Sequence, residues 1–264
     1  MFENRVTTLK LGLVTYNIAR DWDLDTLLSN CEKSGFEGLE LRTTHAHGVE
    51  ISLSPGQRHD TRKLFSDSAV ELWGLGSVCE FHSTNVSELE NEIETCKRWC
   101  ELAKDLGATG VKVRPNCFPE GRSHEETINQ IGRALHECGK AAADNGVEIW
   151  LEVHGNETQH PPQIAKMLAI ANHSSVGVCW NSNQSDVVGG SCSQYYQLLE
   201  QHIKSCHIVN LWDSRYPYRE LFSLLKSQGF SRYTLCEVGT AMLPETGLVF
   251  MQCYAGLWRE LMGA

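Results

Sequence analysis

The sequence lacks any run of the roughly 18 apolar residues that a membrane-spanning helix requires. Its first segment, Met1 to Lys10, is polar and charged, without the apolar stretch of a secretory signal. Low-complexity tracts are also missing, and the composition is ordinary for a soluble globular chain. We therefore expect a cytoplasmic protein that has no membrane partner.

Two nucleotide-binding signatures are missing as well. Neither GxGxxG nor GxxxxGK[ST] follows the first predicted strand, which argues against a dinucleotide-binding or P-loop fold. Basic residues are outnumbered, 23 against 33 acidic ones, and the formal net charge is −10. Nucleic-acid binding draws much of its affinity from clustered Lys and Arg, so no nucleic-acid partner is expected.

The sequence contains 11 cysteines but no CxxC pair. Zinc ribbons and redox motifs depend on such close spacing, and disulfide frameworks are typical of much shorter secreted chains. We expect these cysteines to be reduced and to behave as small, semi-buried hydrophobic residues.

Short β-rich runs alternate eight times with amphipathic helical patterns. We expect strands at residues 11–16, 38–42, 69–78, 110–114, 147–153, 176–180, 205–211 and 233–237. We expect helices at 24–34, 55–66, 86–106, 124–145, 161–171, 193–202, 217–227 and 247–261. This alternation implies parallel strands joined by right-handed crossovers, and eight units in 264 residues favour an α/β fold of the closed (β/α)8 TIM-barrel type. No linker interrupts the pattern, so residues 1–264 are predicted to form one domain.

The predicted strands place polar residues at or near their C-terminal ends, where a TIM barrel carries its active site. Glu152 and His154 are two residues apart and therefore face the same side of their strand. The other strands contribute Arg42, His45, His47, Glu80, His82, Lys112, Arg114, Asn181, His207 and Glu237. Two carboxylates, a histidine nitrogen and an amide oxygen, on Glu152, Glu237, His207 and Asn181, would suit one divalent ion such as Mn²⁺, Mg²⁺, Co²⁺ or Zn²⁺.

Lys112 and Arg114 alternate with valines, so both could point into the barrel, where an unpaired charge is costly. Two interpretations remain open: ion pairs with Glu80 or Glu152 that fill the barrel, or binding of an anionic substrate. The three loop histidines, His45, His47 and His82, are either solvent-exposed or part of a rim or lid.

These motifs resemble the xylose-isomerase-like TIM-barrel superfamily of sugar isomerases, epimerases and related dehydratases. Leu151-Glu152-Val153-His154 is similar to an LExH-like motif of the family, and Cys236-Glu237 to its final Glu. In the CWDxxH-like motif, Asn181 stands in place of the ligand Asp and Gln184 in place of His. In the HLKD-like motif His207 aligns with the ligand, although a shifted register would put Asn210 there.

The resemblance implies a divalent-metal-dependent sugar or cyclitol isomerase or epimerase that abstracts a proton next to a carbonyl through an enediolate. It implies acid and base roles for Glu152 and Glu237 on opposite faces of the substrate, and makes Lys112, Arg114, His154, Glu80 and His82 candidates for substrate binding. Two alternatives remain: a dehydratase acting on a keto-sugar or keto-cyclitol, and a non-catalytic barrel that lost its metal through Asn181. A repair endonuclease, a distant relative, is disfavoured by the acidic composition. Barrels of this family often form homo-oligomers.

Overall fold

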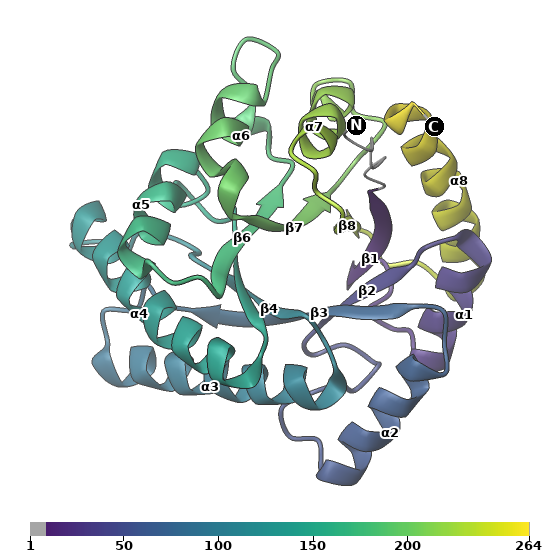
Figure 1. Cartoon of the computed structure of the whole chain (residues 1–264), viewed down its shortest axis with the longest axis horizontal. Helices are drawn as coiled ribbons and strands as arrows, with labels where there is room; N and C mark the ends of the chain where they lie inside the picture. The colour runs from purple at the N-terminus through teal and green to yellow at the C-terminus, as the bar shows by residue number, and fades with distance from the viewer. Residues whose placement is uncertain (1–8, 264) are drawn as a thin grey trace, which may run out of the picture.

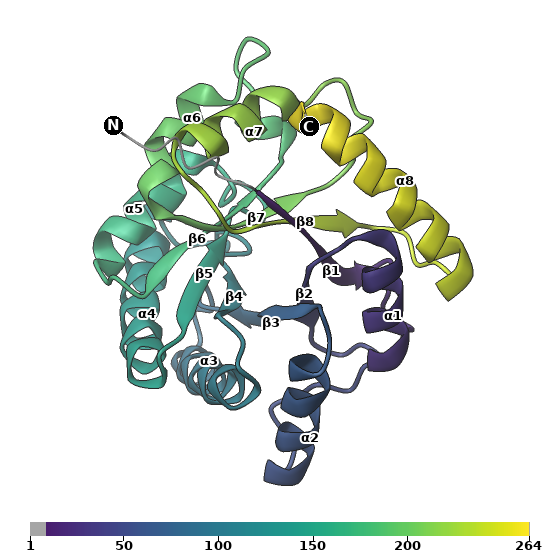
Figure 2. The same cartoon turned by 45° about the vertical axis from the view of Figure 1, so that its right-hand side comes forward.

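The computed structural model describes residues 9–263 and shows a closed ring of eight parallel strands, ordered β1 to β8 in sequence, with β8 paired to β1. The strands are β1 (Lys10–Asn17), β2 (Gly38–Arg42), β3 (Glu71–Glu80), β4 (Gly110–Arg114), β5 (Glu148–Glu152), β6 (Val176–Asn181), β7 (Ile203–Ile208) and β8 (Tyr233–Val238). Helices surround the ring (Figures 1 and 2). The predicted (β/α)8 barrel is confirmed.

Each strand is followed by a helix. They are α1 (Leu24–Ser34), α2 (Pro55–Ser66), α3 (Val86–Leu106), α4 (His124–Asn145), α5 (Pro161–Ala171), α6 (Ser193–Leu199), α7 (Tyr218–Ser227) and α8 (Pro244–Met262), with short 3-10 turns η1 (Gln184–Asp186) and η2 (Glu200–His202). The predicted bounds of α1, α2, α3 and α5 agree with the structure. None of the helices in residues 9–263 is both long and apolar enough to cross a membrane. Most of the polar segment Met1 to Lys10 lies outside the described residues.

Local signals explain the helix ends. The side chain of Asp23 accepts a hydrogen bond from the backbone N–H of Thr26 at the start of α1, a cap that contributes about 1 kcal/mol. Gly35 ends the same helix with φ +77°, a left-handed conformation that a residue with a side chain adopts only at a cost.

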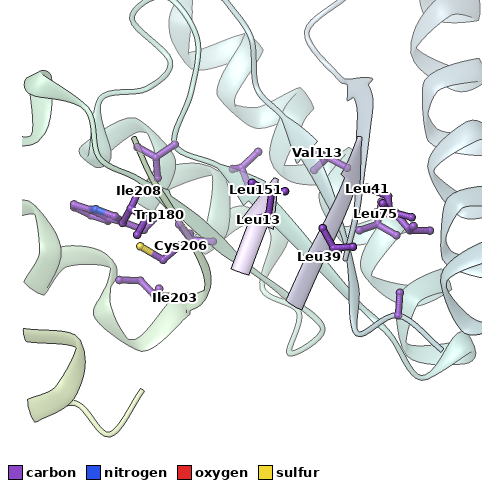
Figure 3. Close-up of a cluster of buried hydrophobic side chains, with 14 of the residues drawn as sticks. Leu13, Leu39, Leu41, Leu75, Val113, Leu151, Trp180, Ile203, Cys206 and Ile208 are labelled. Carbon is purple, nitrogen blue, oxygen red and sulfur yellow. The ribbon is translucent and has the colours of Figure 1, made fainter. Parts of the chain in front are cut away.

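Two sets of side chains fill the protein. Outward-facing strand residues such as Leu13, Leu39, Val113 and Leu151 pack between the sheet and the helices (Figure 3). A second cluster inside the barrel contains Val14, Trp73, Trp150, Cys179, Tyr233 and Leu235. All 11 cysteines are free thiols in this structure, and all of them except Cys117 and Cys253 are buried.

The interior aromatic rings require glycine on neighbouring strands. Trp73 and Trp150 stack with ring centroids 5.2 Å apart. A Cβ atom at Gly110 would lie 2.5 Å from the Trp150 ring. The absence of that atom lets the rings close the barrel floor, and the polar strand ends lie beyond them.

Candidate metal and substrate site

Strand alternation directs the polar residues inward. In β2 the sequence Leu39-Glu40-Leu41-Arg42 alternates apolar and charged residues, and both leucines are buried in the core under the helices. β4 repeats the pattern with Lys112 and Arg114. Because successive side chains of a strand face opposite sides, the charged members share the barrel interior.

The centre of this interior is formed by Glu152, His207 and Glu237. One carboxylate oxygen of each glutamate and a ring nitrogen of His207 all lie within 4.8 Å of one another. The Nδ1 atom of His207 is 3.6 Å from Glu152 and 3.5 Å from Glu237. β5, β7 and β8 thus bring one donor each to a single point.

Asn181 of β6 lies beside this group. Its amide nitrogen donates a hydrogen bond of 3.3 Å to Glu152. Two buried atoms, Oδ1 of Asn181 and Nδ1 of His207, have no hydrogen-bond partner among residues 9–263. A buried polar atom without a partner is costly, and a cation that accepted both lone pairs would remove that cost. The donor set therefore fits one divalent metal ion.

Glu40 is a member of the site that sequence reasoning missed. It is fully buried, and its carboxylate lies 3.1 Å from Nε2 of His207. Because a carboxylate accepts, Nε2 carries a proton and donates it, and Nδ1 faces Glu152 and Glu237. Loss of the Nδ1 proton would leave a lone pair that can bind a cation at this point. The signal was present in the sequence: Glu40 and Arg42 alternate with leucines as Lys112 and Arg114 do with valines.

Lys112 sets the charge state of Glu152. The ammonium lies 2.8 Å from the Glu152 carboxylate, and both side chains are buried. Burial alone would raise the pKa of Glu152, but the positive charge of Lys112 and the adjacent His207 hold this pKa well below its usual value. Glu152 is therefore a carboxylate across the physiological pH range.

The site opens into a cavity of about 80 Å³ lined by Val14, Tyr16, Arg42, Lys112, Arg114, Glu152, His154 and Glu237. Arg114 pairs with Glu80, which also accepts a 2.7 Å hydrogen bond from Asn116. Both ion pairs considered from the sequence, Lys112 with Glu152 and Arg114 with Glu80, are thus formed. Glu80 is the last residue of β3 rather than a loop residue.

The remaining candidates lie elsewhere. His82 lies 3.8 Å from Glu80 and lines a separate hollow between β3 and α3, not the cavity at Glu152. His47 is buried and bonds to the backbone of Arg42 and Val49, so the expectation of an exposed or rim histidine is wrong for it. Between the two registers considered for β7, the structure places His207 inside the barrel, whereas Asn210 is exposed.

Comparison with known proteins gives consistent results. No curated protein matches the sequence. Among solved structures, D-psicose 3-epimerase from Clostridium cellulolyticum H10 superposes with a TM-score of 0.80 at 14% identity, covering 96% of this chain and 99% of that one. An IolI protein with a bound zinc atom gives 0.75 at 20% identity, covering 97% and 98%.

The probable 3-DHS dehydratase AsbF from Bacillus anthracis gives a TM-score of 0.74 at 16% identity, covering 93% and 98%. At such identities these likenesses concern the fold. The family model described as a xylose isomerase-like TIM barrel matches residues 28–249 of the sequence itself. Because this match covers well over half of the sequence and the barrel is closed, this protein belongs to the xylose isomerase-like TIM-barrel family.

Proposed function

We propose that this protein is a divalent-metal-dependent isomerase or epimerase of a sugar or cyclitol, acting by proton abstraction next to a carbonyl. The observation that carries the proposal is the convergence of Glu152 and Glu237 on the Nδ1 side of His207. The structural likeness to a D-psicose 3-epimerase and to a zinc-containing IolI protein supports it.

Glu152, Asn181, His207 and Glu237 would hold the metal ion. When bound, such an ion polarises substrate oxygens and stabilises the negative charge that develops as a proton leaves carbon. The chain's own residues then bind the substrate and move the proton. Glu237 is the more open of the two carboxylates, with 16% of its side chain exposed against 2% for Glu152.

We assign Glu237 as the base that takes the proton from the substrate carbon and Glu152 as its counterpart on the opposite face. Lys112 donates a hydrogen bond of 2.8 Å to Glu152 and so orients that carboxylate. His154 and Arg114 line the cavity and would bind substrate oxygens, while Glu80 positions Arg114. His82 would approach only a substrate that extends toward the β3 end.

The test is deuterium exchange from solvent at the carbon next to the carbonyl, followed by NMR on ketohexoses and keto-cyclitols with Mn²⁺-loaded protein. Glu237→Gln should lower exchange at least about 100-fold, the usual contribution of a general base. Glu260→Gln, on the exposed face of α8, is the matched control and should not change it. Undiminished exchange in either Glu237→Gln or Glu152→Gln would refute the assignment.

A dehydratase is the second candidate, supported by the likeness to the probable dehydratase AsbF. A dehydratase would begin with the same proton abstraction as an epimerase, and the substrate would then lose the hydroxyl group of its β-carbon. An ultraviolet absorbance from the resulting conjugated enone distinguishes it from an epimerase, whose product has no such chromophore.

The third candidate is a binding barrel without catalysis, which the neutral amide of Asn181 favours, because hard cations prefer charged oxygen ligands. Titration of Mn²⁺ or Zn²⁺ into protein that a chelator has freed of metal distinguishes this candidate from the isomerase and the dehydratase. Absence of binding at millimolar metal would select the non-catalytic barrel.

A further inference from the structure

One of the basic side chains that line the cavity has no carboxylate partner among residues 9–263. Three basic side chains line the cavity, Arg42, Lys112 and Arg114. Lys112 pairs with Glu152 and Arg114 with Glu80. Arg42 forms no ion pair with a carboxylate of residues 9–263, and its bonds are to uncharged oxygens of Thr43 and Thr44.

The guanidinium of Arg42 is nevertheless held in place. Nη1 donates to the backbone oxygen of Thr43 at 3.1 Å and to the hydroxyl of Thr44 at 3.4 Å. The group also lies over the ring of Tyr16, 5.2 Å from its centroid, a favourable cation–π contact. Its Nε and Nη2 atoms make no hydrogen bond within the described part of the chain. A fixed fork with free donors is the geometry that binds carboxylate or phosphate in a bidentate manner.

Arg114 offers a further free donor. Its Nη2 is occupied by Glu80, but its Nε is buried without a hydrogen-bond partner among residues 9–263. Arg42 and Arg114 line the same cavity. Burial and the charge of Arg114 lower the pKa of Arg42, against the opposite effect of Glu152 and Glu237. An anion between the two guanidinium groups would relieve their repulsion and satisfy both sets of donors.

The charge balance leads to the same conclusion. The site contains the carboxylates of Glu40, Glu80, Glu152 and Glu237 against the three basic side chains. Adding a divalent cation leaves one net positive charge among buried and half-buried side chains, where an uncompensated charge is costly. A neutral sugar would not compensate it.

We propose that the substrate is an anionic ketose or keto-cyclitol, a carboxylate or phosphate ester, whose anionic group binds Arg42 and the free Nε of Arg114. This inference rests on the proposed function and names its substrate class. Arg42 is then the residue that selects acidic over neutral sugars.

The experiment is isothermal titration of D-fructose, D-fructuronate and D-fructose 6-phosphate, which differ only at carbon 6, into chelated and into Mn²⁺-loaded protein. At least one anion should bind about 10- to 100-fold more tightly than fructose, as expected for hydrogen bonds to a charged group. The better of the two anions identifies carboxylate or phosphate. Arg42→Gln should abolish the preference and Arg42→Lys should retain part of it.

Arg219→Gln is the matched control, because this arginine is exposed on α7 and pairs with Glu260 away from the cavity. It should keep the full preference. Equal binding of fructose and both anions, an unchanged preference in Arg42→Gln, or no binding of either anion at millimolar concentration would overturn the inference. Binding is measured independently of catalysis, so the two proposals can fail separately. A preference for anions without proton exchange would refute only the proposed function. Proton exchange with neutral ketoses and no preference for anions would refute only the substrate class.

Discussion

Glu40 on β2 and His207 on β7 meet inside the barrel at 3.1 Å, although 167 residues separate them in the sequence. Both side chains are fully buried. The contact fixes the ring of His207 so that Nδ1 faces Glu152 and Glu237. Burial alone would lower the pKa of His207, but the neighbouring Cys179, Glu40 and Glu237 raise it well above its usual value.

Glu40→Gln should weaken Mn²⁺ or Zn²⁺ binding about 10- to 100-fold, the usual effect of losing a carboxylate that orients a metal-binding histidine. The amide can still accept from Nε2, so the fold should persist. Titration calorimetry with chelated protein measures the affinity, and Glu260→Gln is the surface control. Equal affinities in the Glu40→Gln variant and the wild type would show that Glu40 only fills space.

Asn181→Asp should strengthen divalent-metal binding about tenfold or more, because hard cations favour charged oxygen ligands. In the chelated protein the same change should lower stability, since a new carboxylate would face Glu152. Competition with a fluorescent chelator measures the first effect and thermal unfolding the second. Asn210→Asp, at an exposed position, makes the same chemical change outside the barrel and should alter neither. Unchanged metal affinity in Asn181→Asp would remove Asn181 from the ligand set.

Asp186 should make stability depend on pH. Its side chain is fully buried in η1, and burial raises its pKa to about 8 from an ordinary 3.8. Between these values the folded protein binds the proton and the unfolded chain does not. The contribution of Asp186 to stability is therefore present below about pH 4 and lost as pH rises toward 8, with a slope approaching about 1.4 kcal/mol per pH unit.

Denaturant unfolding of wild type and Asp186→Asn across this range measures the effect, and the variant should gain stability relative to wild type as pH rises. Asp213→Asn is a useful comparison, because half-buried Asp213 has a pKa lowered to about 2 by its hydrogen bonds with Arg215 and stays ionised throughout. Parallel pH profiles for wild type and Asp186→Asn would contradict the prediction.

Gly110→Ala should cost about 1–3 kcal/mol of unfolding free energy, because the added Cβ meets the Trp150 ring at 2.5 Å and the stacked Trp73 prevents that ring from moving. Gly256→Ala on α8 has no atom near its new methyl group and should gain about 0.5–1 kcal/mol. Urea unfolding of the pair measures both. A neutral Gly110→Ala would show that the barrel floor is loosely packed.

Helix ends could be predicted from the sequence because their signals are local. Asp23 and Gly35 bound α1, and Ser123 caps α4 with Glu126 as its reciprocal partner. For α8 the sequence pattern predicts a start at Gly247, whereas the helix begins at Pro244, a residue suited to a first helical turn. Strand ends are predicted less accurately. The sequence pattern predicts β7 at residues 205–211, whereas the strand spans Ile203–Ile208, because pairing within the barrel sets its bounds.

In the candidate site, too, residues with a local sequence signal could be predicted, whereas those that depend on tertiary contacts could not. Glu152, His207 and Glu237 could be located because each stands at or near a strand end with recognisable neighbours. Glu40 could not be assigned a role, since its partner His207 is distant in sequence and only closure of the ring brings them together. Ion pairs of Lys112 and Arg114 with glutamates are one of the two interpretations that the sequence leaves open. That Arg42 forms no ion pair depends on side-chain positions, which no local sequence pattern specifies.

The stacked indoles of Trp73 and Trp150 have a practical consequence. Trp150 precedes Glu152 by two residues on the same face of β5, so the stack lies directly beneath the carboxylates. Indole emission responds to electric fields, and both rings are shielded from solvent. Native fluorescence should therefore report the arrival of a cation or an anionic sugar without any attached dye.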